Sequence, residues 1–138
     1  MSEHKIVVNQ QFEQPVEEVY ALLSDHNKLS KVFLIPVRRI EDGEDSPNGV
    51  GSVRRLGLGP VAVEETVTAA EPNAFIEYRI TRNGGPIQNH RGRLDFKSQD
   101  QGTQVQWTIQ FEAPTAIIGG GIRAVLENGV RQGLKRVS

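Results

Sequence analysis

The segment from Thr115 to Ser138 holds the one long helical pattern in a chain that otherwise alternates like strands and turns. At about 100° per residue, its apolar and glycine positions fall on one side and its charged positions on the other. The first side comprises Ile118, Ile122, Val125, Leu126, Gly129, Gly133 and Val137, and the second Arg123, Glu127, Arg131 and Lys135. The pattern predicts an amphipathic helix that buries one face and leaves the other in water.

Two glycines stand near the middle of the predicted buried face of this helix. Gly129 and Gly133 each cost roughly 1 kcal/mol of helix propensity relative to alanine. One interpretation is that they let a neighbouring segment come close. The other is that the helix lies across a curved sheet and that the missing side chains leave a cavity.

The rest of the chain has the pattern of an antiparallel sheet. Strands are expected at residues 4–12, 35–41, 50–58, 61–70, 75–82, 87–97 and 104–111. Alternation is clearest in the last, which indicates one wet and one buried face. A helix opened by Pro15 should follow the first strand, with a short helical stretch between His26 and Phe33. The order predicts an α+β fold in which seven antiparallel strands curl around the C-terminal helix.

Length and composition narrow the classes of function. The 138 residues fit one domain over residues 1–138, and a net charge of −1 gives no field that would attract nucleic acid. No apolar run approaches the roughly 18 residues of a membrane span, so we expect a cytoplasmic protein without membrane insertion. There is no cysteine, and the three histidines, His4, His26 and His90, are too scattered to predict a metal site. No phosphate-loop or dinucleotide motif appears, and no cofactor is expected.

Alternation within the strands predicts which side chains point inward, and these are our candidate ligand-binding residues. The inner surface should be mainly apolar, with a few polar groups, as small-molecule sites are. From the strands the candidates are Arg54, Leu56, Leu58, Val63, Glu65, Tyr78, Ile80, Gln88, His90 and Trp107, and from the helix Ile122, Leu126, Gly129 and Gly133.

Arg54 and Glu65 are the charged members of this inner surface. Because an unpaired buried charge is costly, they would most simply pair with each other across neighbouring strands. The pair has two interpretations. It is either a structural ion pair, or one partner joins Tyr78 or His90 in orienting the polar end of a mainly apolar ligand.

Several runs, taken in order, resemble the SRPBCC or START-like superfamily. They are Gly49-Val50-Gly51-Ser52-Val53-Arg54-Arg55-Leu56, Glu65, Ile76-Glu77-Tyr78-Arg79-Ile80, Pro86-Ile87-Gln88-Asn89-His90-Arg91-Gly92 and Gly102-Thr103-Gln104-Val105-Gln106-Trp107. Within it the likeness is greatest to bacterial polyketide cyclase/dehydrase-type proteins, and more distant to plant abscisic-acid receptors and the birch-pollen allergen.

This resemblance implies a helix-grip fold, with a seven-stranded sheet curved around the C-terminal helix and an apolar cavity open at one end. It also implies that Arg54, Glu65, Tyr78 and His90 line or close the cavity. The loops at 58–60 and 84–87 would flank its mouth.

Three functions fit these observations. The first is a carrier or sensor that binds a small apolar or amphipathic molecule, such as a lipid, polyketide or isoprenoid. The second is a polyketide cyclase or dehydrase in which His90 or Glu65 acts as general base and Arg54 stabilises an enolate. The third is a module that docks a protein partner through the exposed sheet face or the basic side of the last helix.

Overall fold

A single antiparallel sheet of seven strands, in the spatial order β1-β7-β6-β5-β4-β3-β2, organises the computed structural model, which describes residues 1–138. The strands are β1 (Ser2–Phe12), β2 (Val37–Glu41), β3 (Val53–Leu56), β4 (Val63–Glu71), β5 (Phe75–Arg82), β6 (Gln88–Gln99) and β7 (Gly102–Ala113). The helices are α1 (Val16–Ser24), η1 (His26–Lys28), α2 (Ser30–Phe33) and α3 (Ala116–Val137). The predicted helix-grip architecture, with short helices after the first strand, is confirmed. None of the helices has the length and apolar character needed to cross a bilayer.

The alternation expected in β7 gives the sheet one buried and one wet face. Val105, Trp107 and Ile109 are buried, whereas Gln106 and Thr108 on the other face keep contact with water. Trp107 faces Val8 of β1 and Leu94 of β6 in the register, and both are buried. The hydrophobic core therefore lies on the concave side of the sheet, between the strands and the helices.

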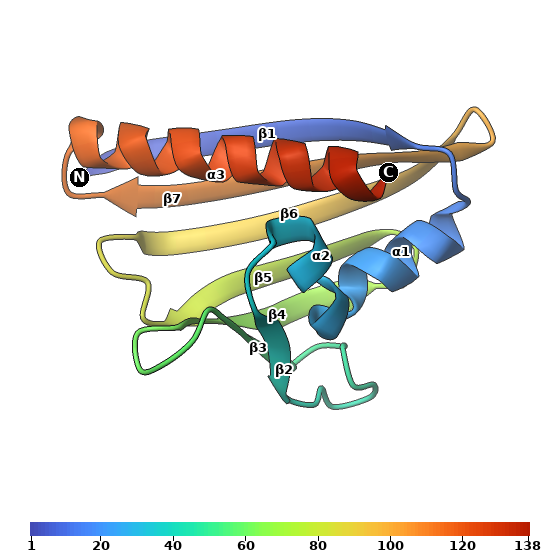
Figure 1. Cartoon of the computed structure of the whole chain (residues 1–138), viewed down its shortest axis with the longest axis horizontal. Coiled ribbons are helices and arrows are strands. Elements are labelled where there is room, and N and C mark those ends of the chain that lie inside the picture. Colours follow the sequence, from blue (N-terminus) through green and yellow to red (C-terminus); the bar gives the residue numbers. More distant parts are fainter.

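The long helix α3 packs on β1, β7 and α2, and Figure 1 shows it running beside β1 and β7, away from β3, β4 and β5. Its buried face differs in part from the predicted one. Val130 and Leu134 are buried, whereas Ile118 is 43% and Val125 73% exposed. Ile122, Leu126 and Val137 are half-buried on the predicted side.

Two glycines explain this rotation of α3. Gly119 lies over the ring of His4 so closely that a Cβ there would overlap the imidazole. A Cβ on Gly133 would lie 2.5 Å from the carbonyl oxygen of Val32 in α2. Gly133 is thus a close-packing position, which supports the first of the two interpretations for this glycine. Gly129 is different, since a Cβ there would meet no atom within 4 Å.

Alanine substitutions at the two positions should therefore have opposite effects. Gly129→Ala should raise the free energy of unfolding by about 0.5–1 kcal/mol, because it adds helix propensity without a clash. Gly133→Ala should lower it by about 1–3 kcal/mol, because the methyl group pushes α3 away from the backbone of α2. Urea denaturation of both variants measures the difference. Equal effects at the two sites would contradict this packing of α3.

Two predicted inward positions are wrong because the strands are shorter or bulged. β3 covers Val53–Leu56 rather than 50–58, since Gly57, with φ of 96°, ends it in a left-handed conformation. Leu58 therefore lies outside the strand and is 77% exposed. Gln88 is also exposed, because the β6 register shifts between Gln88 and Arg91.

Candidate functional site

Arg54 is the centre of a buried polar cluster on the concave face. Its residue is 3% exposed, and its Nε donates to Glu65 Oε1 at 2.8 Å. The two residues are register partners on β3 and β4, so both side chains point to the same face. The predicted ion pair is confirmed. One carboxylate oxygen of Glu65 accepts from Arg54 Nε, and the second oxygen has no hydrogen bond within the chain.

His26 extends this cluster, and the sequence analysis did not select it. Arg54 Nη1 lies 3.3 Å from His26 Nδ1, and His26 Nε2 lies 2.8 Å from Ser52 Oγ. A guanidinium only donates, so Nδ1 is the acceptor and Nε2 carries the proton that Ser52 Oγ accepts. Ser52 in turn donates to the carbonyl of Gly49. Burial, with the nearby Arg54 and Arg39 charges, lowers the pKa of His26 to about 3, so His26 is neutral.

Tyr78 fills the middle of the concave face. Its ring lies across Gly92 of the neighbouring strand, where any side chain would overlap it. Trp107 Nε1 donates to Tyr78 Oη at 2.8 Å, and the Arg54 guanidinium lies 4.6 Å from the ring centroid. Burial, assisted by the Glu65 charge, raises the pKa of Tyr78. The neutral phenol therefore keeps its own proton available for donation.

His90 lies beside Tyr78, with ring centroids 5.5 Å apart, and is 6% exposed. The backbone N–H of Ile80 donates to His90 Nδ1 at 3.0 Å. Burial lowers the pKa of His90, an effect that Glu65 opposes, so the ring is neutral and its proton is on Nε2. Nε2 has no partner in the chain. Gln14 Oε1 is the only fully buried side-chain polar atom that lacks a hydrogen bond. His90 Nε2 also lacks one, so it is not fully buried and is accessible to solvent.

The structure brings most of the predicted ligand-binding residues to this face. Arg54, Tyr78, His90 and Trp107 are buried there, and Glu65 beside them is 12% exposed at its side chain. Leu56, Val63, Ile80, Ile122 and Leu126 are half-buried. Leu58 and Gln88 do not join them, and Gly133 packs against α2. No three metal-ligating side chains come together anywhere in the chain.

The three-residue spacing of His26, Leu29 and Val32 could have identified His26 as a buried residue from the sequence. His26, Leu29 and Val32 are each buried to 1% exposure or less, and all three point from the short helical segment toward the core. Three-residue spacing is that of a 3-10 turn, which the structure has at His26–Lys28. The segment was expected to be helical, but its buried face was not assigned.

Comparison with known protein families shows which family the chain belongs to. The family model described as "Polyketide cyclase / dehydrase and lipid transport" matches residues 3–137. The chain belongs to this family. A search of curated proteins gives no match. The resemblance to the SRPBCC superfamily seen in the sequence is thereby confirmed.

Solved structures share the fold of this polyketide cyclase/dehydrase and lipid transport family member at low identity. A protein of Nitrosospira multiformis is 20% identical, with a TM-score of 0.72 over 95% of this chain and 93% of that chain. Ara h 8.0201 is 11% identical, with a TM-score of 0.68 over 99% and 98%. Aha1 from Colwellia psychrerythraea, solved as a dimer, is 16% identical, with a TM-score of 0.69 over 92% and 90%. At these identities the likeness concerns the fold alone.

In the polar cluster around Arg54, the groups that remain free to bind a ligand are mostly hydrogen-bond donors. His90 Nε2–H, the Tyr78 hydroxyl and Arg54 Nη2 make no donated hydrogen bond within the chain. Glu65 supplies the one free acceptor. The cluster can therefore bind an oxygen that carries lone pairs, such as a carbonyl or carboxylate. His90 cannot accept a proton at Nε2 without changing the tautomer that Ile80 holds.

Proposed function

We propose that the protein binds a small apolar or amphipathic molecule on the concave face of its sheet, as a carrier or sensor. The observation that carries the proposal is His90, whose Nε2–H has no partner in the chain and which lies beside Tyr78 on the buried face of the sheet. The ligand's acceptor oxygen lies at His90 and Arg54. Its apolar body lies along the half-buried side chains of β3 to β5 and α3. Residues 1–138 act as one START-like domain in this proposal, and the cytoplasmic location stays a prediction.

Packing in the interior sets a condition on ligand entry. Trp107 contacts both Phe33 and Tyr78 on the concave face, and Arg54 lies over the tyrosine ring. These side chains fill the middle of the face, so binding requires them to shift toward the less covered side at β3 to β5. A ligand therefore changes the surroundings of Trp107, the only tryptophan of the chain.

Two probes with the same apolar body and opposite heads test this assignment. Decanoate should bind and change Trp107 fluorescence, whereas decylamine, whose head cannot accept a hydrogen bond, should bind more weakly. His90→Ala should weaken decanoate binding by about tenfold or more, because a hydrogen bond to a charged carboxylate contributes about 1.5–3 kcal/mol. Gln88→Ala, an exposed position two residues earlier on the same strand, is the matched control. Equal binding of both probes, unaffected by His90→Ala, would refute the polar end of the site.

Catalysis of polyketide cyclisation or dehydration is the second candidate. Glu65 favours it, because its second carboxylate oxygen is free to act as a base beside the Arg54 guanidinium. The orientation of His90 as a donor weighs against the same role for His90. For an enzyme, Glu65→Gln should retain binding of a linear polyketone and abolish its turnover. A carrier should show no turnover in the wild-type protein either.

A further inference from the structure

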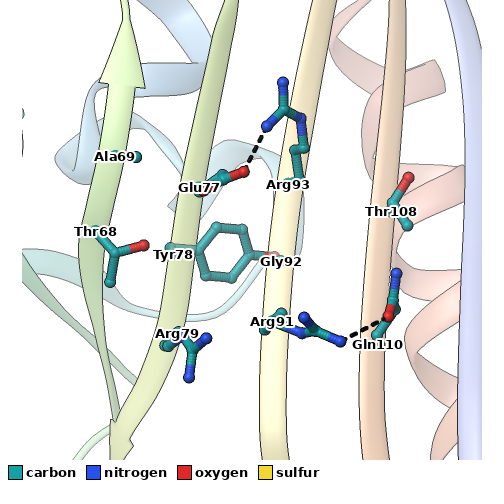
Figure 2. Close-up of a pocket in the computed structure, with 10 residues that line it drawn as sticks. All are labelled: Thr68, Ala69, Glu77, Tyr78, Arg79, Arg91, Gly92, Arg93, Thr108 and Gln110. Atoms are coloured by element: carbon teal, nitrogen blue, oxygen red, sulfur yellow. Dashed lines mark hydrogen bonds and ion pairs between the residues drawn. The ribbon is translucent and has the colours of Figure 1, made fainter.

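The convex face of the sheet carries a hollow of about 450 Å³, on the opposite side from the buried polar cluster. Figure 2 shows that its lining comes from four strands, β4, β5, β6 and β7. The lining residues are Thr68, Ala69, Glu77, Tyr78, Arg79, Arg91, Gly92, Arg93, Thr108 and Gln110. Its size falls in the range of small-molecule sites. Nothing in the proposed function uses it.

Positive charge is concentrated in this hollow, although the chain as a whole is slightly acidic. Three arginines and one glutamate line it, which leaves a local net charge of +2 against −1 for the entire chain. Arg93 is neutralised, because it pairs with Glu77 and donates to Asp95 at 2.9 Å. Figure 2 shows the Glu77–Arg93 pair at one end of the hollow.

Arg79 and Arg91 at the other end have no carboxylate partner. Neither forms an ion pair, and Arg91 only donates to the neutral Gln110 Oε1, at 3.1 Å. They stand on adjacent strands, whose backbones lie about 4.8 Å apart. Figure 2 shows both side chains at this end of the hollow, with Arg91 directed toward Gln110, and an anion beside them would be attracted by both positive charges.

Neutral donors complete the lining. The hydroxyl groups of Thr68 and Thr108 make no hydrogen bond within the chain, and the amide nitrogen of Gln110 is likewise unused. Planar guanidinium groups are suited to oxygens of phosphate and carboxylate, which they bind in a bidentate manner. On β4, the small side chain of Ala69 adds little bulk to the floor of the hollow.

We propose that this hollow is a second binding site, for the dianionic head of a phosphate monoester. Arg79 and Arg91 bind the phosphate oxygens, and the threonine hydroxyl groups donate to the remaining ones. The local charge of +2 matches a phosphate monoester better than a single carboxylate. The phosphate can belong to a free metabolite or to the head group of a lipid such as phosphatidate.

Phenyl phosphate is the probe for the free ligand. Titrated at constant ionic strength, it should shift the backbone amide NMR signals of Arg91, Gly92 and Thr108. Arg91→Gln and Arg79→Gln should each weaken its binding by about tenfold, because each removes a charge-assisted hydrogen bond. Arg123→Gln is the matched control, since it removes the same charge from an exposed position on α3. Equal binding of phenyl phosphate by all four proteins would overturn the proposal.

Vesicles separate the two sources of phosphate. If phosphatidylcholine vesicles containing phosphatidate bind the protein in an Arg91-dependent manner and phenyl phosphate does not, the site takes a lipid head group. If phenyl phosphate binds and the vesicles do not, it takes a free metabolite. Failure of both overturns the proposal. Arg91→Gln should not affect decanoate binding, so this result and that for the concave site are independent.

Discussion

Replacing Arg54 by alanine should lower the free energy of unfolding by about 3–5 kcal/mol. The side chains of Arg54 and Glu65 are 4% and 12% exposed, so removal of the guanidinium leaves a carboxylate without a partner in a largely dry site. It also removes the donor to His26 Nδ1 and the cation over the Tyr78 ring. Chemical denaturation followed by Trp107 fluorescence measures the loss.

The neighbouring residue provides a matched control for this prediction. Arg55 pairs with Glu64 at 3.1 Å between the same two strands, but on the opposite face, where its side chain is 33% exposed. Arg55→Ala should cost about 1 kcal/mol or less, as exposed ion pairs do. Similar losses for Arg54→Ala and Arg55→Ala would contradict the buried position of the first pair.

A double substitution distinguishes a structural pair from a functional one. Arg54→Met combined with Glu65→Leu removes both charges and retains apolar volume, which in other proteins is often neutral or stabilising. We expect this variant to recover most of the stability that Arg54→Ala loses and to bind decanoate more weakly than the wild-type protein. Unchanged decanoate binding would mean that the pair is only structural.

Stability should fall between pH 6.5 and pH 3 because of His26. Its pKa is about 3 when folded and about 6.5 when unfolded, so the unfolded chain binds more protons in this interval. The contribution of His26 to stability is therefore fully present above pH 6.5 and decreases as pH falls toward 3. At pH 4.5 the loss from this residue should be about 2–3 kcal/mol relative to pH 7.

The variant His26→Gln isolates this effect from other titrating groups. Glutamine does not titrate, and it can accept from Arg54 and donate to Ser52 Oγ as the neutral imidazole does. Thermal or urea unfolding from pH 7 to pH 4 should show a steeper decline for the wild-type protein than for the variant. Parallel curves would contradict a neutral, buried His26.

Most of the fold could be predicted because its signals are local. The alternation from Gln104 to Phe111 indicated both the strand and its buried face, and the structure has β7 at Gly102–Ala113. Arg54 on β3 and Glu65 on β4 are register partners and face each other, as expected. These predictions depend on the two-residue alternation of side chains in a strand and on the free-energy cost of an unpaired buried charge.

The errors arose where long-range packing overrides a local pattern. Helical periodicity placed Val125 on the buried face and left Val130 out, whereas the close approach of Gly119 to His4 and of Gly133 to Val32 turns the helix so that Val130 is buried instead. At Gln88, a bulge shifts the alternation that still holds for His90. A single strand does not reveal such a shift.

The chemistry of the site was the least predictable part. The sequence placed His90 inside and left it as a possible base, whereas the hydrogen bond from Ile80 fixes it as a donor. That bond depends on the exact backbone path between β5 and β6. His26 lies on a 3-10 turn that packs on β2, the strand next to β3, and reaches Arg54 from there.

Native mass spectrometry of the purified protein tests directly whether the concave face binds a ligand. We expect that incubation with decanoate adds the mass of one molecule to the 15.3 kDa chain, and that this mass is lost on denaturation. Ile80→Trp, which places a larger side chain at the half-buried end of the concave face, should abolish the addition without preventing folding. A bare mass for the wild-type protein, with no change in Trp107 fluorescence across carboxylate, ketone and alcohol ligands of similar length, would contradict a binding site on the concave face.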